Sequence, residues 1–435
     1  MLLIYCHKIT NRVRYSFRLI FIDVLGIEIQ FIDNSKEFNN HTGPKISYTN
    51  LKISDEIFFL AKPLLFETGI KEQNINVFEW LNGKVFFATS KSSAFPFDPF
   101  ACAFYLASRY EEYLPTIRDD HNRFEAHESI AYLNNFLCKP VINEWALKIK
   151  EMLLLQYPTL VFPDKKYNYV STIDIDNAYA YKQKGVMRTL GAYIRSLLYL
   201  DYKEIIERTR VLLGTKKDIY DTYDFQLEIQ NIYNLKPIYF FLFAEYGLND
   251  KNLPVQNKKF RALIKSTSDN ADVGIHPSYG SNKNIHKLAT EIKRLSTVLN
   301  REVTKSRQHF LKLTFPETYR NLIELGITDD YTMGFASEIG FRASICNSFY
   351  FYDLDLEIET KLRIHPFMVM DASLKYYMKV EPQDAIKKIK PLIDEVKAVN
   401  GTFMSLWHNE SLSNVKQWEG WRDVYSETVK LASEK

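Results

Sequence analysis

Apolar positions in the second half of the chain follow two different periods, and the two periods alternate. Four short segments have strand patterns, and the second is apolar throughout, as in a strand buried on both faces: residues 169–173, 238–244, 273–275 and 402–407. Three longer segments repeat apolar residues with helical period, or begin with proline and stop at a glycine, and these predict helices: residues 284–299, 316–325 and 382–399. Strands that alternate with helices predict a parallel sheet, in which chemistry gathers at the carboxyl ends of the strands.

The first 160 residues have a less regular pattern, which predicts a smaller mixed α/β domain. A short strand is expected at 84–89, and helices are expected at 101–113 and 141–155. The basic and aromatic residues 12–21 could meet a membrane surface, but a first strand and helix of a folded domain is the favoured interpretation. The histidines of this half stand in polar, loop-like settings, so we expect no catalytic constellation here.

Turn-forming residues between 157 and 166 predict the boundary between the two parts. We therefore expect an N-terminal accessory domain at 1–160 and a larger α/β domain at 165–435. Two domains are also the most economical division of a chain of 435 residues.

Composition narrows the class of protein. The chain is 46% apolar and 25% charged, which is ordinary for a globular protein and excludes a disordered or fibrous one. Its 56 basic and 53 acidic residues leave a net charge of +3, which argues against a nucleic-acid binder. The four cysteines are scattered, as in a reduced, cytoplasmic protein. We expect no signal peptide and no transmembrane segment, since the longest later apolar run has seven residues and a span needs about 18. The oligomeric state is left open.

Polar side chains with catalytic potential stand where the predicted strands end. A histidine or an Asp-x-Asp after a strand is commonly structural when it stands alone, as a hydrogen-bonding group or a helix cap. Here the pattern repeats at five strand ends, which favours a functional site: Asp174 and Asp176, His276, Arg307 and His309, Asp330, and His408.

The residue types indicate one kind of chemistry. Imidazole and carboxylate groups without thiolate are the ligands of Zn²⁺, or a comparable divalent ion, in an open catalytic site. A second carboxylate can take a proton from an attacking water, and a histidine can protonate the leaving group. An arginine can orient the base or stabilise developing charge. Together these groups predict a metal-assisted amide or ester hydrolase.

Five short motifs in the second half resemble those of the polysaccharide deacetylases of carbohydrate esterase family 4, the NodB-like group: Thr172-Ile-Asp-Ile-Asp176, His276-Pro-Ser-Tyr-Gly280, Arg307-Gln-His309, Asp330-Tyr331 and Leu406-Trp-His408. Longer strings at 274–279, 307–311, 316–320, 330–335 and 340–343 are similar to a divergent bacterial subfamily. Residues 104–114 resemble an N-terminal domain of unknown function that accompanies it. The resemblance implies a distorted (β/α)₇ barrel of polysaccharide-deacetylase type behind a smaller mixed α/β domain.

The resemblance also implies roles for single residues. Asp176 and His276 match metal ligands, and His309 is the candidate third ligand because Gly280 stands where the family has its second histidine. One divalent ion, most simply Zn²⁺, would occupy this site. Asp174 matches the general base, with one residue inserted between it and Asp176.

Three further roles complete the implied machinery. Arg307 would orient or polarise the base, and Asp330 would brace the arginine. His408 matches the catalytic acid of the family's fifth motif.

The implied activity is removal of an N-acetyl or other acyl group from an amino sugar of a bacterial polysaccharide or its precursor. A cytoplasmic, nucleotide- or lipid-linked precursor is favoured over finished cell wall. Two alternatives remain open. The rim could belong to a catalytically degenerate protein that binds a glycan or a partner enzyme, or it could hydrolyse an amide that is not a sugar.

Overall fold

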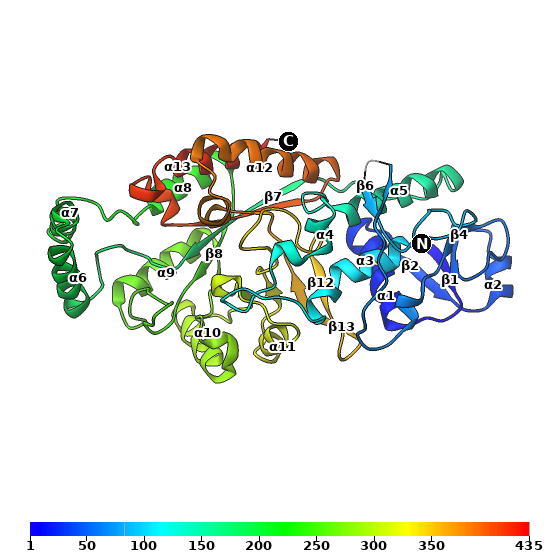
Figure 1. The fold of residues 1–435 in the computed structure, drawn as a ribbon, viewed down its shortest axis with the longest axis horizontal. Helices are drawn as coiled ribbons and strands as arrows, with labels where there is room; N and C mark the ends of the chain where they lie inside the picture. Colours follow the sequence, from blue (N-terminus) through cyan, green and yellow to red (C-terminus); the bar gives the residue numbers. More distant parts are fainter. Residues whose placement is uncertain (82, 435) are drawn as a thin grey trace.

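The computed structural model describes residues 1–81 and 83–434. Its strands form a four-stranded sheet in the first half, a nine-stranded sheet in the second half and a two-stranded pair, β5 (Phe78–Trp80) with β6 (Gly83–Val85). Figure 1 shows the two larger sheets following one another along the longest axis, with the N-terminal sheet at one end.

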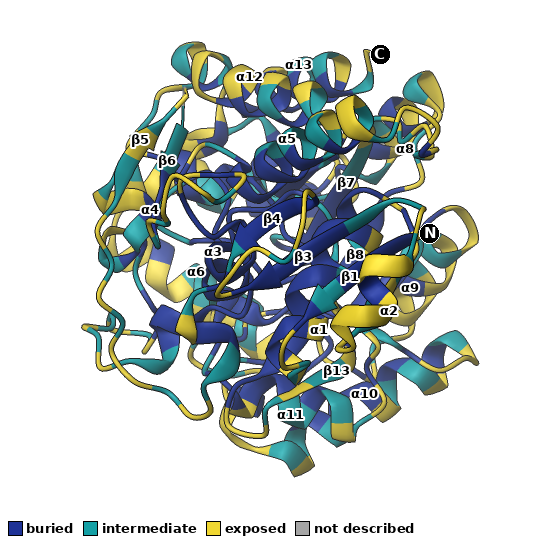
Figure 2. Cartoon of the chain, turned by 90° about the vertical axis from the view of Figure 1, so that its right-hand side faces the viewer, coloured by how far each residue is buried: buried dark blue, intermediate teal, exposed yellow. Residues whose placement is uncertain are grey.

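The sheet of the first half is wholly parallel, in the order β2-β1-β3-β4. It consists of β1 (Leu2–Cys6), β2 (Ile29–Ile32), β3 (Lys45–Thr49) and β4 (Ile57–Leu60). Its main helical segments are α1 (Asn11–Phe17), a π-helix (Arg18–Val24), α2 (Ser35–Asn40), α3 (Pro99–Ala107) and α5 (Val141–Gln156). Figure 2 shows β3 and β4 mostly buried and α2 mostly exposed. The mixed α/β prediction is confirmed for this half, and the apolar side chains of residues 12–21 lie mostly in its core.

Two predicted elements of the first half differ from the structure. The helix expected at 101–113 ends at Ala107, because Arg109 adopts a left-handed conformation with φ of 56° and a 3₁₀ turn follows it. At this turn the buried Arg109 side chain pairs with Glu111 and Glu112. The strand expected at 84–89 is only β6, which ends at Val85.

The sheet of the second half contains nine strands in the order β12-β13-β11-β10-β9-β8-β7-β15-β14. All neighbours are parallel except β12 and β13. The strands are β7 (Asn168–Ile175), β8 (Ile238–Phe241), β9 (Asp272–Ile275), β10 (Lys305–Ser306), β11 (Asp329–Asp330), β12 (Phe349–Asp353), β13 (Ile358–Ile364), β14 (Val369–Met370) and β15 (Thr402–His408). The four predicted strands are therefore present, and they are β7, β8, β9 and β15.

Helices follow the strands as the βα pattern predicts. They are α8 (Tyr223–Tyr233), α9 (Lys258–Asn270), α10 (Ile285–Leu299), α11 (Glu317–Glu324), α12 (Pro382–Ala398) and α13 (Trp421–Ser433). Two more helices, α6 (Val186–Leu198) and α7 (Tyr202–Leu212), form an insertion between β7 and α8. None of the helices in the described residues has both the length and the apolar character needed to cross a bilayer.

Closure of the sheet into a (β/α)₇ barrel is not observed. In the described part of the chain the strand order is linear, and no ladder joins β14 to the β12–β13 edge. The segment between β13 and β14 crosses this gap as irregular backbone. There the Phe367 amide donates to the Met333 carbonyl, and the Met368 amide donates to the Met404 carbonyl. Single hydrogen bonds thus replace a paired strand at this position.

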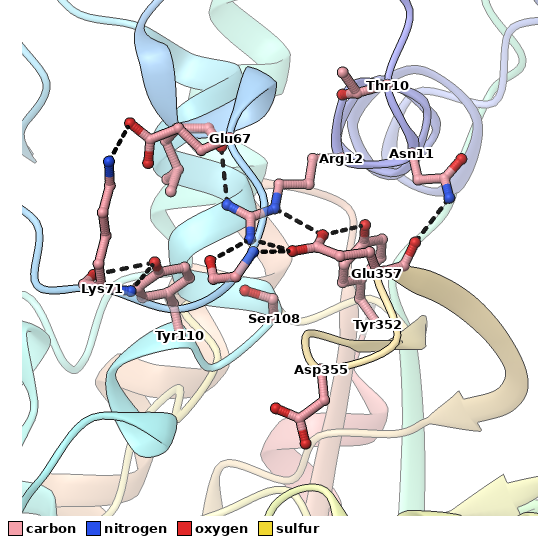
Figure 3. Close-up of polar contacts among 12 residues, drawn as sticks. Thr10, Asn11, Arg12, Glu67, Lys71, Ser108, Tyr110, Tyr352, Asp355 and Glu357 are labelled. Atoms are coloured by element: carbon pink, nitrogen blue, oxygen red, sulfur yellow. Dashed lines mark hydrogen bonds and ion pairs between the residues drawn. The ribbon is translucent and has the colours of Figure 1, made fainter.

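The two halves share one hydrophobic core. Tyr15 and Phe104 of the first half pack against Tyr352 of β12, with ring centroids 5.0 and 5.1 Å apart. Figure 3 shows the polar contact beside this core, where the buried Arg12 of α1 meets Glu357. Arg12 Nε donates to Glu357 Oε2 over 2.8 Å, although the two residues are 345 positions apart in the chain.

A buried cluster of three charged side chains also joins the halves. Glu112 accepts from Arg109 Nε at 2.7 Å and from Arg342 Nε and Nη2 at 2.9 and 2.6 Å. All three side chains are almost fully buried. Arg342 also donates to the Gly334 carbonyl, so Glu112 holds the segment that follows β11.

Candidate active site

The carboxyl ends of β7, β9, β10 and β15 bring the predicted residues to one rim. Asp174 is the penultimate residue of β7 and lies opposite His408, the last residue of β15. His276 follows β9 directly, and Arg307 follows β10. Parallel strands place their carboxyl ends on the same edge, which is why positions so distant in sequence meet here.

Asp176, His276 and His309 form a compact group of three possible ligands. Their ligand atoms all lie within 4.8 Å of one another. Asp176 Oδ1 is 3.2 Å from His276 Nε2, and Asp176 Oδ2 is 3.4 Å from His309 Nε2. Both histidines are buried, and Asp176 is partly exposed.

The other ring nitrogen of each histidine faces an acceptor. His276 Nδ1 is 2.5 Å from the Arg307 carbonyl oxygen, and His309 Nδ1 is 3.0 Å from Asp250 Oδ1. An acceptor at Nδ1 takes the hydrogen bond of that nitrogen and fixes the ring, so that Nε2 points at Asp176. Second partners of this kind typically orient histidine ligands of a metal.

The group fits a divalent cation. Asp176 Oδ1 is buried and has no hydrogen-bond partner among the described residues. Burial by itself would raise the pKa of Asp176, but His309 and His276 hold it well below its usual range, so the carboxylate is charged. Two imidazole nitrogens and one carboxylate oxygen are a common set of protein ligands in open zinc sites.

Asp174 is the second carboxylate of the rim and lies against a buried arginine. Arg307 Nη1 donates to Asp174 Oδ1 over 2.9 Å, and Arg307 Nε donates to the Tyr331 carbonyl over 2.9 Å. The guanidinium lies over the rings of Phe240 and Phe367, at 4.6 and 5.5 Å from their centroids. The side chains of Asp174 and Arg307 are both almost fully buried. The arginine is therefore held in a single orientation toward Asp174.

Asp330 lies near this pair without a hydrogen bond to Arg307 in the described structure. It accepts instead from the Ser306 hydroxyl at 2.9 Å and from the amide and hydroxyl of Thr332 at 2.9 and 2.8 Å. Burial raises the pKa of Asp330 to about 6. Asp330 thus secures the turns after β10 and β11, and the Tyr331 carbonyl is the group that contacts the arginine.

His408 stands on the other side of Asp176 and has its own carboxylate partner. Its Nδ1 is 2.7 Å from Asp371 Oδ1, its amide donates to Asp371 Oδ2 over 2.8 Å, and its Nε2 is 3.7 Å from Asp176 Oδ2. Burial lowers the pKa of His408, but the adjacent Asp371 and the more distant Asp176 outweigh it and raise the pKa to about 10. The imidazole is consequently held in its charged form.

Three groups at the site were not predicted. Asp250 lies in the loop after β8, without any periodic pattern around it. Asp371 follows β14, a strand of two residues that is too short to recognise from the sequence. Arg123 belongs to the first half, where no site residue was expected, and it donates to the Phe310 carbonyl and the Tyr377 hydroxyl.

A cavity of about 200 Å³ opens over these groups. Charged, polar, aromatic and apolar residues all line it: Arg123, Asp174, Asp176, His276, Gln308, His309, Phe310, Leu311, Ala336, Met370, Ala372, Tyr376, Tyr377, Leu406 and His408. The cavity therefore brings three possible metal ligands, a second carboxylate and the His408 imidazole to one small space.

Comparison with known proteins gives a partial result. Residues 2–158 match the model of a family of unknown function, DUF7033. No curated protein matches the chain.

Solved structures resemble the chain only distantly. A protein from Mycobacterium smegmatis assigned as a polysaccharide deacetylase is 12% identical, with 63% of this chain and 86% of that chain covered and a TM-score of 0.39. An allantoinase is 9% identical, with coverages of 62% and 85% and a TM-score of 0.38. A polysaccharide deacetylase from Bacillus cereus is 11% identical, with coverages of 62% and 86% and a TM-score of 0.29. The description of the fold accordingly rests on the strand pairings given above.

Proposed function

We propose that the protein is a metal-dependent hydrolase that removes an N-acetyl or other acyl group from an amino sugar of a bacterial polysaccharide or its precursor. The observation that supports this most is the grouping of Asp176, His276 and His309 beside two further pairs, Asp174 with Arg307 and His408 with Asp371. The groups that a metal-assisted amide hydrolysis requires thus lie around one cavity.

The three possible ligands, Asp176, His276 and His309, support a divalent metal ion as the cofactor. Asp176 Oδ, His276 Nε2 and His309 Nε2 would hold one divalent ion, most simply Zn²⁺, because all three are oxygen and nitrogen donors on one side of the cavity. When it is bound, such an ion supplies a Lewis acid that polarises an acyl oxygen and makes water a better nucleophile.

Asp174 serves as the general base in this mechanism. Its Oδ2 is 3.7 Å from His276 Nε2, so this carboxylate oxygen faces the ligand group while Oδ1 is held by Arg307. An attacking water placed between the two aspartates can lose its proton to Asp174. Arg307 is a positioning residue, because it contacts the base and the Tyr331 carbonyl.

His408 serves as the general acid. The leaving nitrogen of an amide needs a proton as the C–N bond breaks, and a charged imidazolium can supply it from Nε2. Asp371 fixes the ring through Nδ1 and keeps it charged. His408 and Asp174 lie on opposite strands of one pair, β15 and β7, so the acid and the base approach the same ligand.

The walls of the cavity support a sugar as the substrate. Phe310, Tyr376 and Tyr377 supply aromatic surface, and Arg123 supplies hydrogen-bond donors at the edge. Aromatic faces with polar edges suit a pyranose ring, which has both apolar faces and hydroxyl groups. We assign the reaction to a cytoplasmic precursor, as the sequence pattern favours.

Two measurements test the proposal. The purified protein should contain about one transition-metal ion per chain, and anomalous diffraction at the zinc edge should give a peak within about 3 Å of all three ligand side chains. The protein should also release acetate from a panel of N-acetylated amino sugars, free, nucleotide-linked and oligomeric, and a chelator should abolish the release. If the protein contains no metal and binds these sugars without hydrolysing them, it would instead be a glycan-binding module.

A further inference from the structure

The helices α6 and α7 form a hairpin that stands apart from the rest of the protein. Figure 1 shows them, in green, at the end of the longest axis opposite the N-terminal sheet. The hairpin is inserted between β7, which carries Asp174, and α8. The mechanism proposed above uses no residue of the hairpin, so its exposed surface calls for a separate explanation.

The apolar side chains of α6 point to solvent. Residues at positions i, i+3, i+7, i+10 and i+11 form one stripe along this helix, and each is between 51% and 81% exposed: Met187, Leu190, Ile194, Leu197 and Leu198. The chain continues with exposed Tyr199 and Leu200. Such a stripe normally faces the core of a protein, because that face of an amphipathic helix gains most from burial.

Some polar side chains of the same helix lie on its inner side, whereas Arg195 is also exposed to solvent. Arg188, Arg195 and Ser196 line a cavity of about 970 Å³ beneath the hairpin. Glu204 and Arg208 of α7 line the same cavity, and Arg208 pairs with Glu204 at 2.9 Å. The hairpin therefore has polar residues toward the protein and an apolar stripe toward the outside, where an ordinary surface helix is polar.

The second helix repeats this orientation. Tyr202, Ile206 and Leu213 are exposed at positions i, i+4 and i+11, counted through the end of α7. Val211 is buried on its opposite side. The two helices thus present neighbouring apolar stripes, and exposed apolar surface of this extent marks an interaction site.

The charge of the hairpin indicates what covers the stripes. Residues 186–212 carry five lysines and arginines against three acidic residues. Arg195, Lys203 and Arg210 have no ion-pair partner among the described residues. A second copy of the same hairpin would bring like charges together, which is unfavourable. An anionic lipid surface attracts this charge and accepts the apolar side chains.

We propose that the α6–α7 hairpin docks the protein on an anionic membrane surface. The helices have 13 and 11 residues, which is too short to span a bilayer but sufficient to lie along its interface. The stripes enter the boundary between headgroups and acyl chains, and the basic residues meet the headgroup phosphates. The cavity beneath the hairpin includes Asn177, the neighbour of Asp176, so the inner side of the hairpin, away from the docked face, lies toward the candidate active site.

Vesicle flotation tests this proposal. The full-length protein should float with vesicles of phosphatidylcholine and phosphatidylglycerol, and it should float much less with phosphatidylcholine alone or in high salt. The double variant Leu190→Gln/Leu198→Gln should bind the anionic vesicles with an affinity at least about tenfold lower, because two side chains no longer enter the apolar layer. The control Leu51→Gln/Leu155→Gln changes two leucines elsewhere that are at least as exposed, and this variant should bind as the unaltered protein does.

Three outcomes would overturn the proposal. The unaltered protein could stay with the soluble fraction, or the hairpin variant and the control could bind alike. Alternatively, the unaltered protein could be a dimer that Leu190→Gln/Leu198→Gln converts to a monomer without any vesicle binding, which would assign the stripes to a second copy. Circular dichroism checks that the variants are folded. Flotation needs neither metal nor substrate, so its result is independent of the proposed hydrolysis.

Discussion

The variant Asp174→Asn tests whether Asp174 is the general base or a metal ligand. The change removes one negative charge and preserves the shape of the side chain. Asp174 and Arg307 are both almost fully buried, and their contact measures 2.9 Å. The oxygen of the new amide could still accept the hydrogen bond from Arg307 Nη1, but the guanidinium would lose its buried countercharge.

The variant should change the unfolding free energy and the turnover, and it should leave the metal content unchanged. Removing one partner of a buried pair costs about 3–5 kcal/mol of unfolding free energy. Because an acceptor remains and the Tyr331 carbonyl still holds Arg307 Nε, we expect Asp174→Asn to cost about 3 kcal/mol, the lower end of that range. Turnover should fall by about 10²–10⁴, the usual contribution of a group that transfers a proton. Metal content should stay near that of the unaltered protein, since Asp174 lies outside the three-ligand group.

Acetate release, urea unfolding and elemental analysis measure the three quantities on the same preparations. The matched control is Asp272→Asn, whose carboxylate pairs with Lys236 and Lys305 near the surface and is 32% exposed. That change should cost at most about 1 kcal/mol and leave turnover unaffected. An Asp174→Asn protein that loses its metal would mean that Asp174 is a ligand and Asp176 is the base. Unchanged turnover would refute the assignment of Asp174 altogether.

Three further predictions concern the acid, the ligand support and the joint between the halves. His408→Ala should slow hydrolysis of an amide by about 10²–10⁴ but should slow an activated aryl ester far less, because that leaving group needs little protonation; equal losses on the two substrates would remove His408 from the mechanism. Asp250→Asn should weaken zinc binding by about 10- to 100-fold in a competitive chelator titration, since it loosens His309 Nδ1; an unchanged affinity would show that the Asp250 contact does not support the ligand. Glu112→Gln should lower the unfolding free energy by about 3–5 kcal/mol, because it leaves two buried guanidinium groups without their shared carboxylate. The surface change Lys148→Gln, measured by the same urea titration, should stay within about 0.5 kcal/mol, and similar costs for both would contradict the role of Glu112.

The parts of the fold that the sequence predicts are those with a strong local period. The buried strands β7, β8 and β15 and the helices α10 and α12 lie within one or two residues of their expected starts. The hairpin of α6 and α7 was not expected, and its apolar stripe faces solvent instead of a core. Closure of the sheet was expected and is not seen. A few backbone hydrogen bonds around Phe367 take the place of a paired strand, and such contacts leave no pattern in the sequence from which they could be predicted.

The residues of the candidate site likewise fall into those that the sequence predicts and those that it does not. Residues directly after strands, such as Asp174, His276 and His408, could be predicted because parallel strands end on one edge. Their partners could not, since Asp371 follows a strand of two residues and Asp250 lies in a loop. Arg123 reaches the cavity only because the two halves pack together, and no local sequence pattern reports that packing.

The joint between the halves also has a consequence for the time course of synthesis. Arg12 emerges from the ribosome early, but its partner Glu357 is 345 positions later. At about 5–20 residues per second the ribosome needs roughly 20–70 s to add that stretch. Throughout this interval the nascent first half lacks the partner of its buried arginine and the ring of Tyr352 that covers Tyr15 and Phe104. The first half therefore cannot complete these contacts until Tyr352 and Glu357 have been added, and a chaperone that shields these aromatic side chains should raise the yield of folded protein.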